Sequence, residues 1–225
     1  MKRVAVFASG GGSNLGALVT YLDALGPGAA AGIVLVVSDR PGAGALDRAA
    51  RRGIASATLD DPSAAVELLE ILAEHRVDLI VLAGYLKRVP HEVTEAFRGW
   101  MINVHPALLP RHGGPGMYGI RVHRAVLAAR DPESGATVHF VDADYDRGPV
   151  IARARVPVEA GDTADALAAR VLVAEHFLLP RTVHALAREL VALHRDGAVS
   201  VATTAPALFS GAPAGVTIAL GSSAR

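Results

Sequence analysis

The chain has 225 residues, 51% of them hydrophobic, which is enough for one packed domain and argues against disorder. Lys plus Arg and Asp plus Glu both number 22, so the formal net charge is zero. This excludes a strongly basic nucleic-acid binder, although not a local basic patch. The chain has no cysteine, which excludes disulfides, a thiol nucleophile and cysteine-bound metal. No apolar run approaches the ~20 residues of a membrane-spanning helix, and we expect a cytoplasmic protein.

The first half of the chain alternates between apolar runs and helical stretches. We expect strands in the short, largely apolar runs 3–8, 33–37, 77–83 and 101–104. Between them we expect helices over 15–25, 43–52 and 64–75. Strands that are apolar along their length and alternate with helices predict an α/β fold. We expect an open, mostly parallel twisted sheet with helices on both faces and a Rossmann-like N-terminal half.

The pattern changes after His105. A long loop rich in proline and glycine is expected over 106–119, and such loops in compact domains are often functional. A helix to Arg130 follows, and two further strands are predicted over 136–141 and 150–158.

In the last part of the chain, a helical pattern is followed by a segment whose secondary structure is less clearly indicated. Residues 162–195 predict one or two helices, with Pro180 as an interruption. We expect residues 1–196 to form a single domain. Residues 197–225 are expected to be a C-terminal extension, either a hairpin or a poorly ordered tail.

The glycine-rich string SGGGSN lies between the first strand and the first helix. Glycines let the backbone approach a ligand closely, and free N–H groups at a helix start favour an anion. Gly12, Ser13 and Asn14 are therefore candidates for a phosphate site, and the alternative is a tight turn capped by Ser13 or Asn14. The string is not a Walker motif, because no lysine follows, and Leu15 occupies the third glycine position of the dinucleotide fingerprint.

Asn103 and His105 lie at the end of the fourth predicted strand. Alternation puts both side chains on one face, at the sheet edge where ligands of open α/β sheets bind. An amide donor beside an imidazole suits a reaction that turns a carbonyl oxygen into an oxyanion. The acidic turn 142–149 is either a solvated hairpin turn or, if it lies near His105, the source of a carboxylate that favours the imidazolium.

Two other kinds of site are not expected. His105, His112 and His123 are separated by 7 and 11 residues, which matches no common metal-ligand spacing, and no metal is predicted. Neither Ser9 nor Ser13 lies in the G-x-S-x-G pattern of a hydrolase nucleophile.

Six strings together resemble one family. They are ASGGGSNLGAL, VVSDRPGAGALDRA, VDLIVLAGYLKRVP, INVHPALLPRHGGPGMYG, TVHFVDADYDRGPVI and GDTADALAARVLVAEHFLLP. From about Val4 to about Leu186 they are similar to the phosphoribosylglycinamide formyltransferases, folate-dependent enzymes of purine synthesis. The N-x-H-P-x-L-L-P string alone is typical of the wider group of formyltetrahydrofolate-using enzymes. The SGGGSN loop and the GD…EH segment select this family.

The resemblance implies roles for individual residues. The catalytic residues that it implies are Asn103, His105 and Asp146. The substrate phosphate is expected at Gly12, Ser13 and Asn14, and the ribose and glycyl end of the substrate at Glu175. The folate is expected to contact Leu86, Lys87, Arg88, Val89, Asn103, Arg111, Asp142, Ala143, Asp144 and Tyr145. Three features depart from the family. Arg88 replaces an apolar residue, residues 60–65 contain no counterpart of a basic residue often found before the third helix, and the loop 113–120 is longer than usual.

The implied reaction moves a formyl group from 10-formyltetrahydrofolate, as cosubstrate, to the amine of glycinamide ribonucleotide. Asn103 is expected to donate to the formyl oxygen, protonated His105 to stabilise that oxygen, and Asp146 to sustain the imidazolium and relay a proton. The expected partners are these two small molecules, without nucleic acid or membrane, in a monomer or homodimer. The alternatives are methionyl-tRNA formyltransferase, formyltetrahydrofolate hydrolase and a non-catalytic nucleotide- or folate-binding module.

Overall fold

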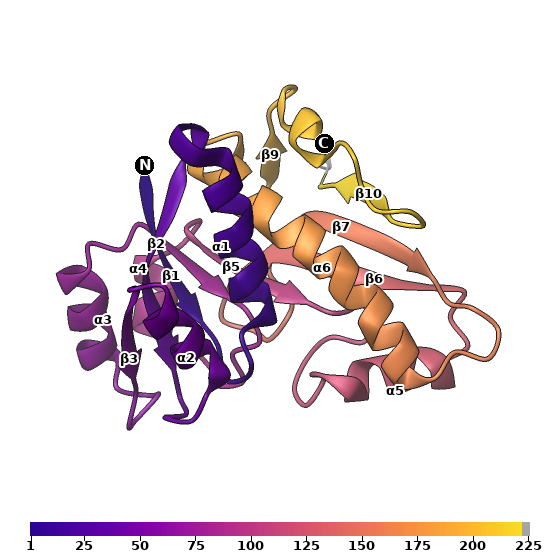
Figure 1. Cartoon of the computed structure of the whole chain (residues 1–225), viewed down its shortest axis with the longest axis horizontal. Helices are drawn as coiled ribbons and strands as arrows, with labels where there is room; N and C mark the ends of the chain where they lie inside the picture. Colours follow the sequence, from indigo (N-terminus) through magenta and orange to yellow (C-terminus); the bar gives the residue numbers. More distant parts are fainter. Residues whose placement is uncertain (222–225) are drawn as a thin grey trace.

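An eight-stranded sheet forms the centre of the fold, in a computed structural model that describes residues 1–221 (Figure 1). Its strand order is β10-β7-β6-β5-β4-β1-β2-β3. The strands are β1 (Lys2–Phe7), β2 (Ala31–Ser38), β3 (Ala55–Thr58), β4 (Leu79–Leu82), β5 (Met101–His105), β6 (Glu133–Phe140), β7 (Val150–Pro157) and β10 (Thr217–Leu220). From β5 to β3 the strands are parallel, whereas β6, β7 and β10 are antiparallel to their neighbours. The predicted mostly parallel sheet is confirmed.

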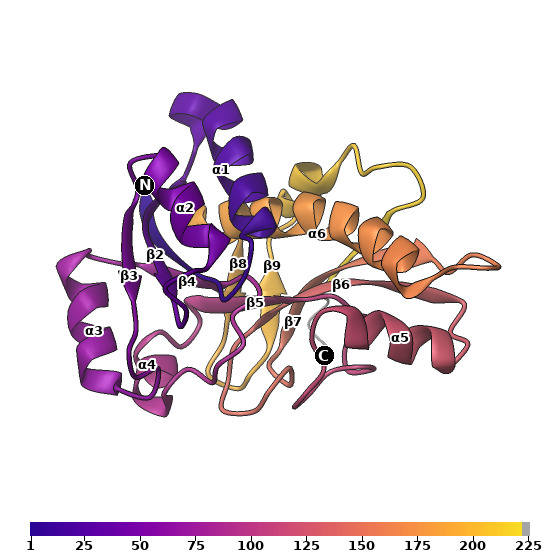
Figure 2. The ribbon, with the colours of Figure 1, turned by 60° about the horizontal axis from the view of Figure 1, so that its bottom comes forward.

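Helices cover both faces of this sheet, as expected (Figure 2). They are α1 (Ser13–Leu25), α2 (Gly44–Arg51), α3 (Ala65–Glu74), α4 (His91–Ala96), α5 (Ile120–Ala128) and α6 (Ala164–Ala187), with short 3₁₀ helices η1 (Gly26–Gly28) and η2 (Ala205–Phe209). Leu18 of α1 and Leu178 of α6 belong to the core on one face. Leu68 of α3 and Val93 of α4 belong to a separate core on the other face.

The helix α6 runs without interruption through Pro180, so the predicted break there is wrong. Proline lacks the N–H that would bond the carbonyl of His176, four residues earlier. Pro180 is buried in a segment whose neighbours Leu179 and Val183 belong to the main core. Burial of these side chains offsets the missing hydrogen bond and keeps the helix continuous.

The residues after α6 return to the sheet. β8 (Val191–Leu193) and β9 (Val199–Val201) form a separate two-stranded antiparallel sheet, and β10 extends the main sheet along β7. Phe209 of η2 is 6% exposed and belongs to the main core. The last four residues of the predicted extension, 222–225, lie outside the described residues.

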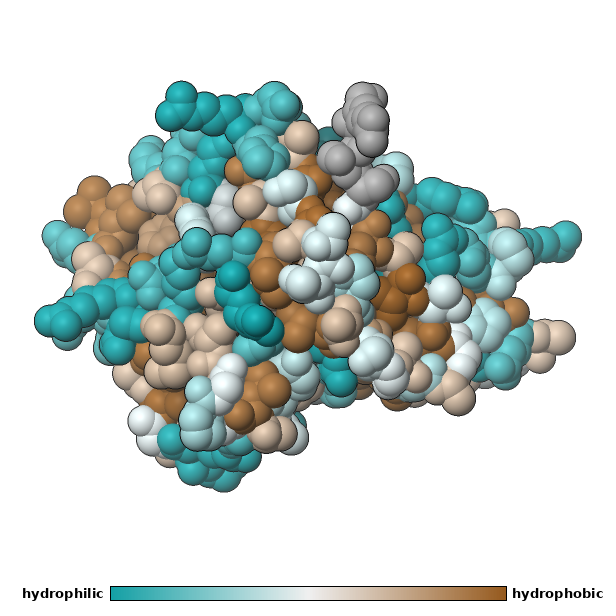
Figure 3. Space-filling view, turned by 90° about the horizontal axis from the view of Figure 1, so that it is seen from above, coloured by the Kyte–Doolittle hydropathy of each residue, from teal (hydrophilic) through white to brown (hydrophobic). Residues whose placement is uncertain are grey.

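One face of the surface mixes polar and apolar side chains in small groups (Figure 3). Within residues 1–221, no helix combines the length and the apolar character needed to cross a bilayer.

Candidate active site

A cleft of about 650 Å³ opens at the carboxyl ends of β4 and β5. Its walls come from the loop that follows β4, from residues 114–120, from the turn between β6 and β7, and from one side of α6. The volume lies within the range of ~300–1,000 Å³ that is typical of small-molecule sites. The cleft occupies the sheet edge at which we expected a ligand.

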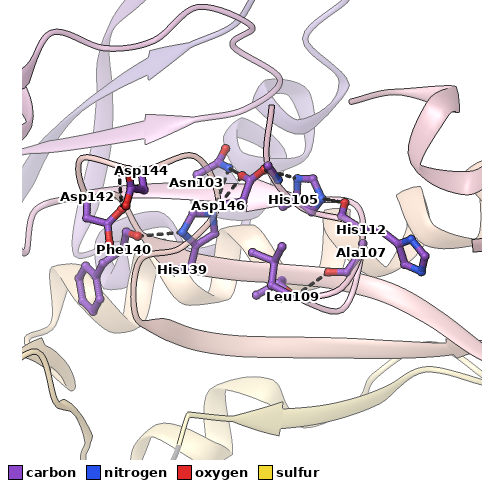
Figure 4. Close-up of polar contacts among 12 residues, drawn as sticks. Asn103, His105, Ala107, Leu109, His112, His139, Phe140, Asp142, Asp144 and Asp146 are labelled. Carbon is purple, nitrogen blue, oxygen red and sulfur yellow. Dashed lines mark hydrogen bonds and ion pairs between the residues drawn. The ribbon is translucent and has the colours of Figure 1, made fainter. Parts of the chain in front are cut away.

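Asn103, His105 and Asp146 meet in this cleft (Figure 4). Asn103 Nδ2 donates to Asp146 Oδ1 at 3.2 Å, and His105 Nδ1 lies 3.5 Å from Asp146 Oδ2. Asp146 is held at a φ of +56°, and its Oδ2 accepts a hydrogen bond from the Gly114 N–H at 2.9 Å. Of the two interpretations of the acidic turn, the structure supports the one that puts a carboxylate beside the imidazole.

The charges of this trio depend on burial. Burial lowers the pKa of His105, although the Asp146 carboxylate opposes the effect. Burial would raise the pKa of Asp146, but the contact with His139, the charge of His105 and the Gly114 N–H outweigh burial and lower it. Asp146 is therefore a carboxylate, whereas the imidazolium of His105 is a stronger acid than a free histidine.

His139 also lines the cleft and contacts this trio, and the sequence interpretation missed it. It lies opposite Asn103 in the β5–β6 pair. Its Nδ1 lies 2.8 Å from the Phe140 carbonyl oxygen, which can only accept, so Nδ1 carries a proton. In the neutral ring Nε2 then accepts from Asn103 Nδ2 at 3.1 Å and orients the amide. The available signal was a histidine inside a largely apolar predicted strand.

Asn14 and Glu175 form a buried pair at one end of the cleft. Asn14 Nδ2 donates to Glu175 Oε2 at 2.5 Å, across 161 positions of sequence. Burial raises the pKa of Glu175 to about 7, and the Asn14 hydrogen bond only partly opposes this. The structure thus brings together two residues that the resemblance assigns to the same substrate.

The three residues of the predicted phosphate loop do not share one surface. Asn14 lines the main cleft, whereas Ser13 lines a neighbouring cavity of about 320 Å³ together with Arg48 and His176. Gly12 lines neither of these cavities, and its φ of +70° turns the chain into α1. Gly12 also lies so close to α2 that an added Cβ would be 2.8 Å from the Cα of Ala45.

Most of the residues expected to contact the folate line the cleft. They are Leu86, Lys87, Arg88, Val89, Asn103, Asp142, Ala143, Asp144 and Tyr145. Arg88 Nη2 donates to the Ala143 carbonyl at 2.7 Å, so the two segments that we expect to contact the folate are joined directly. Leu86 and Tyr145 are 36% and 43% exposed, which leaves apolar surface available to a ligand.

Arg111 does not line this cleft. Its guanidinium pairs with the Asp131 carboxylate, and both residues line a third cavity of about 350 Å³. The structure therefore gives no contact between Arg111 and the expected folate site. Within residues 1–221, no cluster of three or more His, Asp or Glu side chains has the arrangement of a metal site.

Comparisons with known proteins show which family the chain resembles. A family model described as formyl transferase matches residues 2–183. The chain is 40% identical over 204 residues to the chloroplastic phosphoribosylglycinamide formyltransferase of Arabidopsis thaliana, covering 87% of this chain and 69% of that protein. It is 36% identical over 203 residues to the phosphoribosylglycinamide formyltransferase of Escherichia coli (strain K12), covering 87% of this chain and 92% of that one.

The solved structures include a similar fold. The crystal structure of phosphoribosylglycinamide formyltransferase from Anaplasma phagocytophilum superimposes with a TM-score of 0.80 at 34% identity, covering 88% of this chain and 92% of that one. Some relatives are longer: the chain spans 64% of the Vigna unguiculata enzyme and 14% of a trifunctional purine biosynthetic protein of Drosophila melanogaster. From the matched residues and the shared fold together, the chain belongs to the formyl transferase family.

Proposed function

We propose that the chain transfers the formyl group of 10-formyltetrahydrofolate to the amine of phosphoribosylglycinamide, giving formylglycinamide ribonucleotide and tetrahydrofolate in purine biosynthesis. The observation that carries this proposal is the meeting of Asn103, His105 and Asp146 in one cleft. The names of the relatives point to the same reaction.

The nucleophile needs little help from the protein. The glycyl amine resembles an α-amino group, whose reference pKa of ~7.7–8.0 leaves a useful fraction neutral near neutral pH. Attack of the amine nitrogen on the formyl carbon forms the new C–N bond and turns the formyl oxygen into an oxyanion. The cleft must therefore stabilise negative charge on that oxygen and move one proton.

Asn103 and His105 are placed to stabilise the oxyanion. The Asn103 amide has two N–H hydrogens, directed at His139 and Asp146. We assign the formyl oxygen to the hydrogen that faces Asp146, while His139 keeps the amide in place. The Nδ1 atom of His105 faces the same point, and a charged N–H there supplies a second donor.

The reaction moves one proton from the amine to the folate nitrogen, and we assign this transfer to the neighbourhood of His105 and Asp146. The amine loses one proton after attack, and the folate nitrogen must gain one proton as its C–N bond to the formyl carbon breaks. Asp146 and a water molecule relay this proton. Burial lowers the pKa of His105, so its imidazolium is a stronger acid and a stronger hydrogen-bond donor to the oxyanion than a free histidine would be.

The two substrates are assigned to opposite ends of the cleft. The folate packs between residues 86–89 and 142–145, and the ribose and glycyl end of the ribonucleotide lies at Asn14 and Glu175. Its phosphate then reaches Ser13 at the start of α1, where free backbone N–H groups favour an anion.

An acceptor assay tests this function. Purified protein and 10-formyltetrahydrofolate are supplied with phosphoribosylglycinamide, methionyl-tRNA or water alone, and His105→Ala serves as the inactive control. We expect formyl transfer to phosphoribosylglycinamide only. Transfer to tRNA, hydrolysis without transfer, or folate binding with no reaction would each select one of the alternatives instead.

The proposal also covers the binding partners of the protein and its location in the cell. We expect the two small molecules to be the ligands, with no nucleic acid or membrane, and a cytoplasmic monomer or homodimer. Sedimentation across a range of protein concentrations distinguishes the two oligomeric states, and cell fractionation tests the location.

A further inference from the structure

His105 is held from both sides of its ring. Its Nδ1 faces Asp146, and its Nε2 lies 2.8 Å from the backbone carbonyl oxygen of His112 (Figure 4). A carbonyl oxygen accepts hydrogen bonds and never donates them, so Nε2 carries a proton in both charge states of the ring. The proton that His105 can gain or lose is therefore the one on Nδ1, which faces the reacting carbonyl.

The His112 carbonyl is fixed by an unusual stretch of backbone. His112 has a φ of +55°, in the left-handed region that only a few per cent of non-glycine residues adopt. The next residue is packed tightly, because a Cβ added to Gly113 would lie 2.5 Å from Leu109 Cδ2. Such a conformation persists only where surrounding contacts determine it.

Asp131 supplies one of those contacts. Asp131 follows α5 and is 7% exposed, and its Oδ2 accepts from Nε2 of His112 at 2.7 Å. The hydrogen bond from His112 and the charge of Arg111 lower the pKa of Asp131, so it remains a carboxylate at neutral pH. Asp131 and His112 line the third cavity and not the main cleft, so neither is placed to touch the substrates.

We propose that Asp131, through the side chain of His112, holds the His112 carbonyl against His105 and so keeps the mobile proton of His105 on Nδ1. Asp131 and His112 are positioning residues in this scheme. The catalytic consequence rests on the proposed function, in which His105 is the acid of formyl transfer.

The scheme predicts a change in pH dependence. The His112 carbonyl raises the pKa of His105, because it accepts a hydrogen bond from the imidazolium. Among the other titratable groups, Asp146 raises the pKa of His105, whereas His139 and the ring of His112 lower it. His123 lines the same cleft, and burial and the charge of His105 lower the pKa of His123. Loss of the carbonyl contact lowers the pKa further, so activity that needs protonated His105 disappears at a lower pH.

Asp131→Ala and Asp131→Asn test the proposal together. Asp131→Ala removes the acceptor, whereas Asp131→Asn keeps an oxygen that His112 can bond. We expect Asp131→Ala to lower kcat about tenfold to a hundredfold, the range seen when partners that orient metal-bound imidazoles are removed, with little change in either KM. The alkaline limb of its kcat profile moves to lower pH, and Asp131→Asn restores part of both effects.

The matched control is Glu133→Gln. Glu133 lines the same cavity as Asp131, but its carboxylate pairs with Arg155 and not with His112. We expect Glu133→Gln to leave kcat, both KM values and the pH profile at the wild-type level. An equal loss of kcat in this control would show that any substitution in this cavity lowers activity. That result would overturn the specific role of Asp131.

A second measurement does not depend on activity. Nitrogen-15 NMR of histidine-labelled protein reports which ring nitrogen of His105 is protonated, with His105→Ala used to assign the signal. We expect Nε2–H in the wild type and a mixture of tautomers in Asp131→Ala. An unchanged tautomer, or a changed tautomer with unchanged kcat, overturns the proposal. A wild-type protein that transfers no formyl group overturns the proposed function instead, and the tautomer result still decides the role of Asp131.

Discussion

At the scale of single residues, the proposed reaction depends on the amide of Asn103 and the imidazole of His105. We expect Asn103→Ala or His105→Ala to lower turnover by ~10²–10³, the cost of losing one oxyanion donor. The measurement is steady-state kinetics, accompanied by thermal unfolding to show that the fold is intact. Wild-type turnover in either folded variant would remove that residue from the mechanism.

Glu175 gives a prediction about stability. Its pKa is about 7 in the folded protein and near 4.5 in an unfolded chain, so the unfolded state releases its proton first as the pH rises. The free energy of unfolding therefore falls between about pH 4.5 and pH 7, by about 3 kcal/mol from this group. Glu175→Gln removes that fall, because an amide has no proton to release in this range.

Urea unfolding at pH 4.5 and at pH 8 measures the effect. Other groups also titrate, so the informative quantity is the difference between Glu175→Gln and wild type at each pH. We expect the variant to gain stability relative to wild type at pH 8 compared with pH 4.5. If the free energy of unfolding changes with pH by the same amount in both proteins, the pKa of Glu175 is not raised in the folded state, which would contradict this prediction.

At the scale of elements, the glycine loop before α1 positions the residues that we expect to bind the substrate phosphate. Gly12→Ala places a Cβ 2.8 Å from Ala45 and imposes a left-handed φ of +70° on alanine. We expect a loss of about 1–3 kcal/mol in the free energy of unfolding and weaker binding of phosphoribosylglycinamide than of folate. Urea unfolding and titration calorimetry check these results.

Gly10→Ala is the matched control for this loop. A Cβ at Gly10 meets no heavy atom within 4 Å, and its φ lies outside the left-handed region. We expect stability and ribonucleotide binding close to wild type. Equal damage from both substitutions would mean that loop flexibility, and not the close approach to α2, is what matters.

The elements were predictable wherever local pattern and packing agree. The apolar runs at β1, β2, β4 and β5 gave correct strands, because a buried parallel strand is apolar along its length. β3 was missed because its string ASAT has no apolar run, and it lies at the sheet edge. Pro180 misled the prediction because burial in the core, which the local sequence does not reveal, decided the outcome.

The site was predictable only in part for a similar reason. Asn103 and His105 share a strand, so alternation alone places them together. The meeting of Asp146 with that strand came from the resemblance, and His139 depends on the antiparallel register of β5 and β6, which no local pattern shows. In our proposal Asp131 and His112 act through the backbone carbonyl of His112. Every residue has such a carbonyl, so the sequence does not indicate which one contacts His105.

At the scale of the whole molecule, the C-terminal segment packs against the catalytic part of the chain. We propose that residues 197–221 unfold together with the rest. Phe209→Ala is expected to lower the free energy of unfolding by about 3 kcal/mol, because the side chain is buried in the main core. Pro206→Ala, at an exposed position of the same 3₁₀ helix, is the control and is expected to have little effect. Two separate unfolding transitions in the wild type would contradict this proposal.

The bond from Arg88 to the Ala143 carbonyl bears on how the cleft admits its ligand. Two loops from distant parts of the chain are tied together before any ligand arrives, so their conformational entropy is lost during folding and not during association. A ligand that binds between these loops therefore meets one restraint on their separation that already exists in the free protein.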